Sequence, residues 1–471
     1  MSEALRAELA RIVGPRWVRS RPAELAAYEA DGLPTHASRA ALAVLPGTRR
    51  ELVEVIRLLH LADVPFVARG AGTGLSGGAL AGADAVLVIL TRLNRILGLD
   101  ALSRRAIVEP GVVNARLSET ALPHRLHYAP DPSSQTACTL GGNVAENAGG
   151  PHCLKYGVTT NHVAALDVLL ADGTTARLGS PSGEPWGPDL VGLFVGSEGM
   201  FGIALQITLR LEPLPASVRT LLAPFPTIRA ASEAVSGIIA AGIVPAAMEM
   251  MDQACVRAVE ASIYAAGYPV DAAAVLLVEV DGSPASVAAE ATAVERLLLF
   301  HGAAEVRVAE TMAERARLWQ GRKKAFGAMG RIAPDLAVQD AVVPRSALPD
   351  ILDQVAAIAR RHRLTVANVF HAGDGNLHPN ISFDSRDPEL VARVHAANRD
   401  IMHACLAAGG SITGEHGVGS DKLEYMPEAF DAETLGAMRA VREAFDPSGR
   451  ANPGKVIPLH ACREWHRGAR P

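Results

Sequence analysis

The stretch PDPSSQTACTLGGNVAENAGG, residues Pro130–Gly150, is almost uncharged and dense in glycine, asparagine, serine and threonine. Small side chains of this kind let a backbone lie close against a large polar ligand. Two further clusters share this composition, RGAGTGLSGG at Arg69–Gly78 and GSEGMFGI at Gly196–Ile203. Three such loops on one strand-rich half of the chain indicate a single extended ligand.

The first of these loops contains a literal G-x-G-x-x-G at Gly72, Gly74 and Gly77. The Rossmann fingerprint requires a helix to begin at that point, and Gly78 and Gly82 make such a helix improbable. We therefore expect successive backbone N–H groups of the loop to form a nest that holds a pyrophosphate. A plain flexible loop is the alternative interpretation.

A second constellation, HAGDGNLH at residues 371–378, is followed by GEHG at residues 414–417. If Asp374-Gly375 forms a two-residue hairpin turn, His371 lies opposite His378, with Cβ atoms ~4.5–5.5 Å apart. That spacing suits two imidazoles sharing a divalent cation, to which Glu415 could add a third ligand. The alternative is a hairpin with two surface histidines.

Bulk composition narrows the classes of function. With 471 residues, 49% hydrophobic and 20% charged, the chain should form two or three well-buried units. A formal charge of −5 without a basic stripe argues against nucleic acid. Five scattered cysteines support neither a disulfide framework nor an iron–sulfur cluster. The amino terminus lacks the apolar core of a signal peptide, and no apolar run approaches a membrane span. We expect a cytoplasmic protein, with peripheral docking at a membrane through a partner as an alternative.

The pattern of elements changes at Glu212–Pro215. Before it we expect short strands at 64–68, 85–90, 105–108, 164–170 and 202–211, with helices at 48–62 and 113–122. After it we expect strands at 273–280, 304–308, 364–370 and 377–383, with helices at 228–242, 284–302, 349–363 and 431–445. This alternation indicates a split βαβ, ferredoxin-like layer that is repeated once.

The three glycine-rich clusters, in order and spacing, resemble the FAD-binding domain of the vanillyl-alcohol oxidase (PCMH-type) superfamily. HAGDGNLH, GEHGVGSDK and the closing NPGK at Asn452–Lys455 resemble its D-2-hydroxyacid dehydrogenase branch, which includes glycolate oxidase FAD subunits and D-lactate dehydrogenases. The resemblance implies an α+β fold. A two-part FAD-binding domain would occupy 1–215, with its core at about 38–215. A ferredoxin-like α/β cap domain with an antiparallel sheet would occupy 216–428, and the segment 429–471 would return to the FAD domain.

The resemblance also implies which residues hold the flavin. Some superfamily members tether FAD through a histidine or cysteine in the first loop, and Arg69–Gly78 contains neither, so we expect non-covalent FAD. The residues expected to bind it are Arg69, Gly70, Ala71, Gly72, Thr73, Gly74, Ser76, Gly77, Pro130, Ser133, Thr139, Gly141, Gly142, Asn143, Asn147, Gly149, Gly150, Glu198, Gly199, Ile203 and Asn452.

The expected reaction is oxidation of a small D-2-hydroxyacid, glycolate or D-lactate, with hydride passing to flavin N5. Zinc or manganese on the two histidines and Glu415 would lower the pKa of the substrate hydroxyl, and His416 would act as the general base. Arg322, in a Trp319-x-x-Arg pattern, matches the substrate arginine of the branch, and Asn380 matches a position that contacts substrate. Electrons would pass to an iron–sulfur partner subunit, an electron-transfer flavoprotein or a quinone. A homodimer is one option for assembly.

Three alternatives remain open at this point. A D-2-hydroxyglutarate dehydrogenase would need a threonine and a lysine for the distal carboxylate, where a hand alignment places Phe326 and Val338. A flavin-domain subunit of a larger glycolate oxidase, without activity of its own, is the second. A metal-dependent hydrolase is the third, and it would leave the three glycine clusters unexplained. The sequence leaves the identity of the hydroxyacid, the acceptor and the metal undecided.

Overall fold

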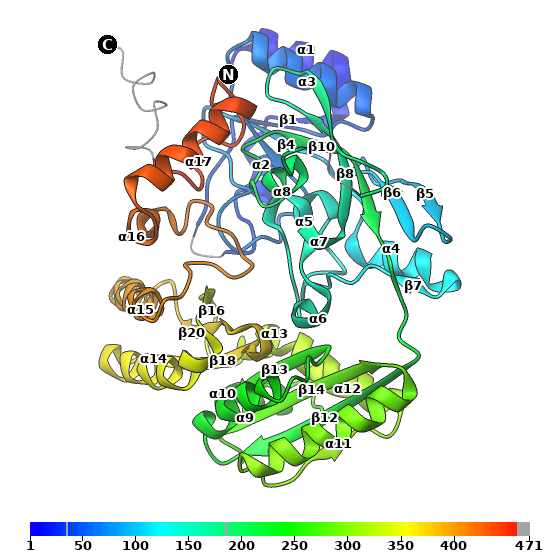
Figure 1. Cartoon of the computed structure of the whole chain (residues 1–471). Helices are drawn as coiled ribbons and strands as arrows, with labels where there is room; N and C mark the ends of the chain where they lie inside the picture. Colours follow the sequence, from blue (N-terminus) through cyan, green and yellow to red (C-terminus); the bar gives the residue numbers. More distant parts are fainter. Residues whose placement is uncertain (34–35, 184–186, 459–471) are drawn as a thin grey trace. The chain divides into compact units, whose positions relative to one another are not determined.

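The computed structural model describes residues 1–33, 36–183 and 187–458 (Figure 1). The contacts divide the chain into two compact units. Unit 1 consists of Met1–Gly149, Gly157–Leu214 and the chain from Glu415 onward, and unit 2 consists of Gly150–Tyr156 and Pro215–Gly414. These ranges differ from the expected domains in two places, because 150–156 packs with unit 2 and 415–428 packs with unit 1.

Unit 1 contains a four-stranded sheet near the amino terminus. Its strands, in spatial order, are β1 (Val18–Arg19), β2 (Leu42–Val44), β4 (Val86–Ile89) and β3 (Phe66–Arg69). The helices associated with it are α1 (Glu3–Val13), α2 (Pro22–Leu25) and α3 (Arg49–Leu61). Helix α3 begins at Thr48, whose hydroxyl accepts a hydrogen bond from the Glu51 N–H and so caps the helix. Its apolar side chains at helical spacing are buried, which attaches α3 to the sheet.

A five-stranded antiparallel sheet forms the second part of unit 1. Its spatial order is β5 (Ile96–Asp100), β6 (Arg105–Val108), β10 (Ile203–Arg210), β8 (Val163–Leu169) and β9 (Thr175–Gly179). The elements around it are β7 (Leu126–His127), β11 (Glu212–Pro213), α4 (Asn114–Ala121), α5 (Leu140–Glu146), α7 (Thr159–His162) and α8 (Leu190–Phe194). Its apolar residues form a core of their own.

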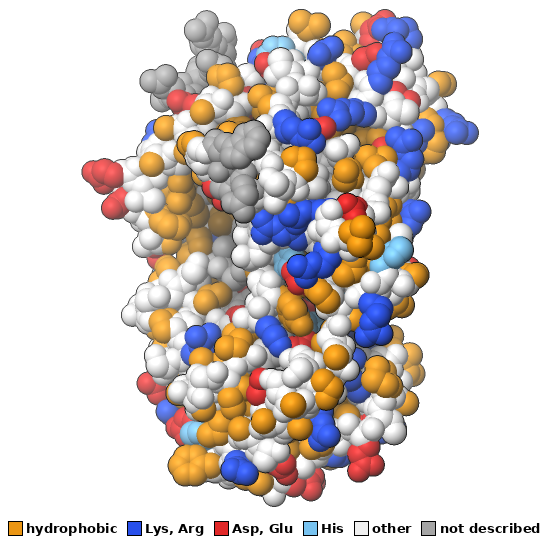
Figure 2. Space-filling model, turned by 45° about the vertical axis from the view of Figure 1, so that its right-hand side comes forward, with side chains coloured by type: hydrophobic (Ala, Val, Ile, Leu, Met, Phe, Trp, Pro, Cys, Tyr) orange, Lys and Arg blue, Asp and Glu red, His pale blue; other side chains and the backbone are white. Residues whose placement is uncertain are grey.

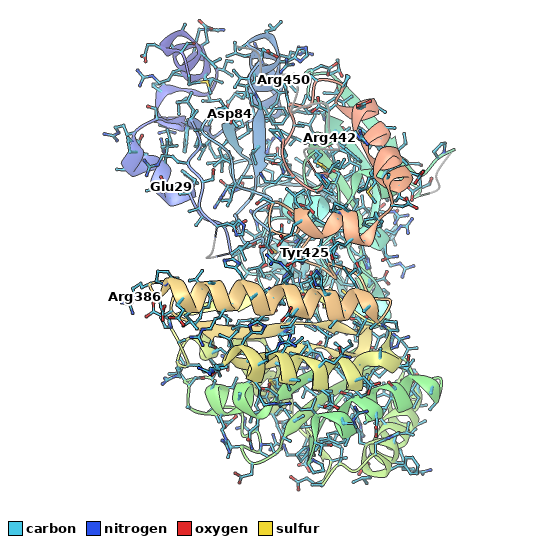
Figure 3. All side chains as sticks on the ribbon, turned by 90° about the vertical axis from the view of Figure 1, so that its left-hand side faces the viewer. Glu29, Asp84, Arg386, Tyr425, Arg442 and Arg450 are labelled. Atoms are coloured by element: carbon cyan, nitrogen blue, oxygen red, sulfur yellow. The ribbon has the colours of Figure 1, made fainter. Side chains whose placement is uncertain are left out.

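The chain beyond Glu415 completes unit 1. It contributes α16 (Met426–Ala429) and α17 (Ala432–Phe445), and Ala451 forms a parallel bridge with Phe66 beside β3. Arg442 on α17, labelled in Figure 3, is buried, and its Nη2 donates to the Ala451 carbonyl at 3.1 Å. The end of the described chain is therefore built into the first sheet.

Unit 2 is built on antiparallel strands arranged as two ferredoxin-like halves. The first half has the spatial order β15 (Arg307–Val308), β12 (Ser217–Phe225), β14 (Ala274–Gly282) and β13 (Ala247–Asp252). The second half contains β16 (Asp335–Val338), β20 (Pro379–Phe383) and β18 (Thr365–His371), with β17 (Ala341–Val342) and β19 (Asn376–Leu377) alongside. Strand β13 pairs with β18, which joins the halves edge to edge. The predicted repeat of a split βαβ layer is confirmed.

The helices of unit 2 follow the same repeat. They are α6 (Cys153–Tyr156), α9 (Ile228–Ala240), α10 (Gln253–Glu260), α11 (Pro284–Phe300), α12 (Met312–Lys323), α13 (Ala325–Met329), α14 (Leu348–His362) and α15 (Pro388–Ala407). Helix α11 packs on α9, α9 packs on α14, and α14 packs on α15. Figure 3 shows α14 and α15 side by side. Helices α10, α12 and α13 form a second group in mutual contact.

Three general properties bear on function. Within the described residues, no helix has the length and apolar character that a membrane span requires. Basic and acidic side chains are interspersed on the face drawn in Figure 2. The four described cysteines, Cys138, Cys153, Cys255 and Cys405, form no disulfide with one another.

Candidate functional site

The three glycine-rich clusters converge within unit 1. Asn452, in the closing NPGK motif, donates from Nδ2 to the carbonyls of Gly78 at 3.0 Å and Glu198 at 2.6 Å. The Glu198 N–H in turn donates to the Ala145 carbonyl at 2.8 Å. Gly78, Ala145 and Glu198, one from each cluster, are thus linked by hydrogen bonds, with the Asn452 side chain joining Gly78 to Glu198. A common ligand would require this convergence.

The first loop is anchored by Arg69, which is buried at the end of β3. Its guanidinium donates to the carbonyls of Tyr28, Ala30 and Ala79 at 3.3, 2.7 and 3.4 Å. Gly72 and Gly77 adopt left-handed φ values of 72° and 73°, which favour glycine. No helix begins in this loop, so the structure agrees with our rejection of a Rossmann-type turn.

The second cluster contains a helix that the sequence did not suggest. Helix α5 begins at Thr139, whose hydroxyl accepts from the Gly142 N–H at 3.3 Å. Asn143 is buried and accepts from Asn114 Nδ2 at 2.9 Å, and Asn147 ends the helix in a left-handed conformation. Of the other predicted flavin residues here, Ser133 is exposed and Gly150 belongs to unit 2.

Unpartnered polar atoms at this convergence test whether a flavin fits. The buried Oγ atoms of Ser76 and Ser197 and the buried Oδ1 of Asn452 have no hydrogen-bond partner among the described residues. A buried polar atom without a partner costs free energy, so these three atoms indicate a polar ligand. They come from the first cluster, the third cluster and the NPGK motif, which is the distribution that an extended cofactor such as FAD would satisfy.

Glu146 in the second cluster and Glu198 in the third carry carboxyl groups that are shielded from solvent. Glu198 accepts hydrogen bonds from the N–H groups of Val418 at 2.7 Å and Gly419 at 2.8 Å. Burial raises the pKa of Glu198 in spite of these donors. Burial raises the pKa of Glu146 well above its usual range, and the nearby carboxyl groups of Glu198 and Asp31 raise it further. The N–H donors to Glu198 offset part of the effect of its burial, and burial raises the pKa of both carboxyl groups.

In unit 2, the histidine hairpin differs from the predicted register. His371 pairs with Asn376, not with His378, because residues Ala372–Asp374 form a 3₁₀ turn instead of a two-residue turn. Arg345 stabilises this turn, because its Nη1 donates to the Gly373 carbonyl at 3.0 Å. The prediction that His371 and His378 oppose each other directly was therefore wrong.

The two histidines are nevertheless close, because residues 376 and 378 share one face of the strand. Their ring centroids are 5.4 Å apart, and one ligand atom of each lies within 4.8 Å of the other. His371 Nδ1 is 2.8 Å from Glu249 Oε1, and His378 Nδ1 is 3.1 Å from the Gln339 carbonyl. Acceptors at both Nδ1 atoms place the protons there and present Nε2 as the lone-pair nitrogen, the arrangement typical of metal-ligating histidines.

Asp340 adds a carboxylate to this region. It is fully buried, and its Oδ2 accepts from Thr413 Oγ1 at 2.6 Å and from the Gly414 N–H at 2.9 Å. Its Oδ1 is 3.9 Å from His378 Nδ1. Imidazole nitrogens and carboxylate oxygens are ligands of zinc and manganese, so the donor set fits a divalent cation.

Arg322 lies near the end of α12 and is almost completely buried. Its Nη2 is 2.5 Å from Oε2 of Glu249, the carboxylate whose other oxygen contacts His371. Its Nε and Nη1 have no hydrogen-bond partner among the described residues. The predicted substrate arginine is thus next to the histidine pair and retains donors for a carboxylate.

The remaining predicted residues of unit 2 also lie around His378. Asn380 is buried, donates from Nδ2 to the His378 carbonyl at 2.6 Å, and has no partner for its Oδ1 among the described residues. The Phe326 ring is 6.3 Å from the His378 ring, and Val338 pairs with Asn380 between β16 and β20. Both hand-aligned positions are therefore apolar, with Phe326 beside His378 and Val338 opposite Asn380.

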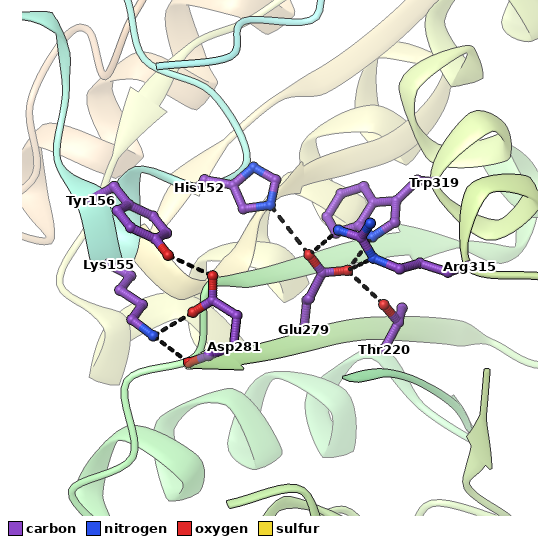
Figure 4. A network of polar contacts seen from close by, with 8 residues as sticks. All are labelled: His152, Lys155, Tyr156, Thr220, Glu279, Asp281, Arg315 and Trp319. Atoms are coloured by element: carbon purple, nitrogen blue, oxygen red, sulfur yellow. Dashed lines mark hydrogen bonds and ion pairs between the residues drawn. The ribbon is translucent and has the colours of Figure 1, made fainter. Parts of the chain in front are cut away.

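Figure 4 shows what holds α12 in place. The Glu279 carboxylate on β14 accepts from Arg315 at 2.8 and 2.6 Å, Trp319 Nε1 at 2.6 Å and Thr220 Oγ1 at 2.5 Å, with His152 Nε2 at 3.5 Å. Burial opposes ionisation of Glu279, but hydrogen bonds from His152 and Arg315 outweigh it and lower the pKa to about 2. Since Arg315 and Trp319 lie on α12, this carboxylate fixes the helix that carries Arg322.

The same view explains why residues 150–156 pack with unit 2. Tyr156 OH donates to Asp281 Oδ2 at 2.5 Å, and Lys155 Nζ donates to the Asp281 carbonyl at 2.6 Å. Helix α6 is therefore bonded to the end of β14, although its sequence lies inside the predicted FAD-binding domain.

Glu415 and His416 belong to unit 1, where His416 Nε2 is 3.9 Å from Glu415 Oε1. Glu415 directly follows Gly414, the last residue of unit 2, whose N–H is bonded to Asp340. Sequence reasoning overlooked Glu249 and Asp340. An acidic residue inside the apolar run AAMEMMD, at 246–252, was the available signal for Glu249.

The fold and the flavin-type loops define a PCMH-type flavoprotein, and comparison with known proteins agrees. The model of the FAD linked oxidases, C-terminal domain, matches residues 214–456, and that of the FAD binding domain matches 40–179. The chain belongs to the FAD-linked oxidase family and is a FAD-dependent oxidoreductase.

Similar proteins are named as follows. "Glycolate oxidase subunit GlcD" of Escherichia coli (strain K12) is 47% identical over 94% of this chain and 89% of that protein. The subunit of the same name from Bacillus subtilis (strain 168) is 36% identical over 97% of each. "D-lactate dehydrogenase" of Anaerostipes hadrus is 32% identical over 86% of this chain and 87% of that protein. The solved structure of p-cresol methylhydroxylase with substrate bound shares the fold, with TM-score 0.83, 16% identity and 97% of each chain covered.

Proposed function

We propose that this protein oxidises a small D-2-hydroxyacid, glycolate or D-lactate, to the 2-oxoacid. The observation that carries the proposal is the buried group in unit 2: two histidines with Nε2 presented, next to an arginine with two unused donors. This is a site for an oxygen-rich anion and a cation together. Relatives named glycolate oxidase subunit and D-lactate dehydrogenase support the same substrate class.

Residue roles follow from the chemistry. Arg322 binds the substrate carboxylate through the N–H groups of its guanidinium, and Asn380 Oδ1 accepts a hydrogen bond from the substrate. A divalent cation, zinc or manganese, on His371, His378 and Glu415 would lower the pKa of the substrate hydroxyl. His416, adjacent to Glu415, takes the hydroxyl proton. The three loops of unit 1 would hold non-covalent FAD, which would supply the acceptor for the hydride on the substrate Cα.

The two hand-aligned apolar positions bear on substrate size. Phe326 and Val338 offer no charge or hydrogen bond to a second carboxylate. A D-2-hydroxyglutarate would bury its distal carboxylate unpaired at such a wall, which is costly. We therefore favour a short or apolar-tailed monocarboxylate over a dicarboxylate.

Reduced flavin has to pass its electrons onward. We propose an external acceptor: an iron–sulfur partner subunit, an electron-transfer flavoprotein or a quinone. The scattered cysteines, and relatives named as oxidase subunits, support a separate acceptor. The chain would then act in the cytoplasm, or at a membrane surface through its partner, as a single copy or a homodimer.

Anaerobic titration of the flavin with D- and L-hydroxyacids tests the proposal. Glycolate or D-lactate should bleach the oxidised flavin spectrum, and L-lactate should not. Exhaustive chelation should stop the bleaching while the oxidised spectrum survives. Failure of every hydroxyacid to bleach the flavin would favour the second candidate, a flavin-domain subunit without activity of its own. Rapid reoxidation in air would show an oxidase that needs no separate acceptor.

A further inference from the structure

The buried carboxylate of Glu249 contacts both halves of the proposed site. We propose that Glu249 is a positioning residue with two tasks: it orients His371 toward a divalent cation, and it holds Arg322 by charge until a substrate carboxylate replaces it. This inference rests on the proposed function, because it assigns a role within the same site.

The first contact is fixed by the sheet. Glu249 on β13 pairs with His371 on β18, and its Oε1 is 2.8 Å from His371 Nδ1. A carboxylate at Nδ1 holds the proton there, sets the ring orientation and increases the basicity of Nε2. Loss of such an outer partner typically lowers metal affinity ~10–100-fold.

The second contact differs in kind. Oε2 of Glu249 is 2.5 Å from Arg322 Nη2, but no described donor makes an aligned hydrogen bond to Oε2. Arg322 Nε and Nη1 are also without partners among the described residues. The pair is therefore held by charge, with hydrogen-bonding capacity unused on both sides. A ligand carboxylate has two acceptor oxygens and can satisfy the fork of Arg322 as Glu249 does not.

The balance of charge gives the inference a direction. Glu249 and Asp340 are two buried carboxylates near the histidine pair, and Arg322 is a single buried cation beside them. An excess of negative charge attracts a divalent cation and repels an anion. Removing the charge of Glu249 should therefore weaken cation binding and strengthen carboxylate binding at Arg322. A merely structural residue would weaken both.

Glu279 provides a matched control. It is also a buried glutamate of the same sheet with an arginine and a histidine as partners, Arg315 and His152. Its carboxylate is engaged by hydrogen bonds from Thr220, Trp319 and Arg315 (Figure 4), a set of partners distinct from His371 and Arg322. Its removal lowers the stability of unit 2 and leaves both contacts of Glu249 in place.

The experiment compares Glu249→Gln with Glu279→Gln in the full-length, FAD-loaded protein. Calorimetric titration with Mn²⁺ after chelation gives the cation affinity. Titration of the metal-free protein with 2-hydroxy-2-methylpropanoate, which has no Cα hydrogen to lose, gives the carboxylate affinity. We expect Glu249→Gln to bind Mn²⁺ ~10–100-fold more weakly and the carboxylate more tightly. Glu279→Gln should lower the melting temperature and change both affinities far less than Glu249→Gln does.

Unchanged Mn²⁺ affinity in Glu249→Gln, or parallel loss of both affinities, would overturn the inference. If this variant does not fold, Glu249→Gln combined with Arg322→Met removes both charges, and Arg322→Met alone is its reference. Mn²⁺ should bind more weakly to the double variant, and equal affinities would overturn the inference. A wild-type protein that binds no Mn²⁺ or Zn²⁺ would overturn the metal site itself. Normal binding by the wild type with an unaffected Glu249→Gln overturns only the role of Glu249.

Discussion

Two pairs of glutamates, one in each unit, are stabilised by different means. In unit 2, Glu249 and Glu279 each lie against an arginine, and hydrogen bonds lower the pKa of Glu279 to about 2. In unit 1, Glu146 and Glu198 lie together, and burial raises the pKa of both. The pair in unit 2 thus lies against cationic side chains, whereas the pair in unit 1 lies in glycine-rich loops where burial opposes ionisation. The difference matches a cation and anion site in one unit and a flavin cradle in the other.

The largest effect is expected at His416, the proposed proton acceptor. His416→Ala should slow flavin reduction by D-lactate or glycolate ~10²–10⁴-fold, the usual contribution of a general base, while FAD stays bound. Stopped-flow absorbance of the flavin measures the rate. Reduction at the wild-type rate would show that another residue takes the proton.

Acid should weaken unit 2 first. The pKa of Glu279 is about 2 in the folded chain and near 4.5 when unfolded, so its stabilisation is present above about pH 4.5 and is lost as pH falls toward 2. The loss amounts to roughly 3 kcal/mol at pH 2, of which about 2 kcal/mol falls above pH 3. Urea unfolding followed by tryptophan fluorescence between pH 6 and pH 3 measures that part. The dependence should disappear in Glu279→Gln, and its persistence there would assign it to other groups.

Removing Arg315, the arginine partner of Glu279, should reduce the stability of unit 2 by a smaller amount. Arg315→Met leaves Glu279 with Thr220, Trp319 and His152, and the Arg315 side chain is 28% exposed. We therefore expect a loss of roughly 2 kcal/mol in unit 2 stability, below the usual value for a fully buried pair. Arg386→Met is the control, because Arg386 pairs with Asp384 at the surface (Figure 3) and should leave the urea midpoint unchanged. Equal effects of the two substitutions would contradict the prediction.

The smallest effect concerns Glu146. Because its folded pKa is raised, its contribution to stability is complete below the unfolded value near 4.5 and is lost as pH rises through the folded value. Glu146→Gln should therefore cost no more than ~1 kcal/mol near pH 5 and should flatten the decline of unit 1 stability as pH rises above 5. Thermal unfolding of the two proteins between pH 5 and pH 9 measures this. An unchanged decline in the variant would place the titrating group elsewhere.

Local chemistry made much of the fold predictable. The strand Arg105–Val108 was predicted to the residue, and the helix expected at 48–62 begins after its Thr48 cap. The glycine-rich clusters also converge as predicted, since their composition encodes closeness to backbone. Signals of this kind lie within a few consecutive residues.

The unpredicted features depend on distant residues. Strand β13 was missed because Glu249 interrupts its apolar run, and only Arg322 and His371 make that charge tolerable in a buried strand. The register at His371 failed because Val343 donates to the Gly375 carbonyl and Arg345 to that of Gly373, which draws the turn into a 3₁₀ form. The pairing of α6 with Asp281 joins residues about 125 positions apart.

The bridge between Phe66 and Ala451 has a consequence for synthesis in the cell. The edge of β3, formed early, receives its partner only when the last described residues leave the ribosome. At ~5–20 residues per second, translating Pro215–Gly414 alone takes roughly 10–40 s. Throughout that delay the amino-terminal half is complete in sequence but lacks its final cover. Nascent chains of this protein should therefore depend on chaperones until translation ends.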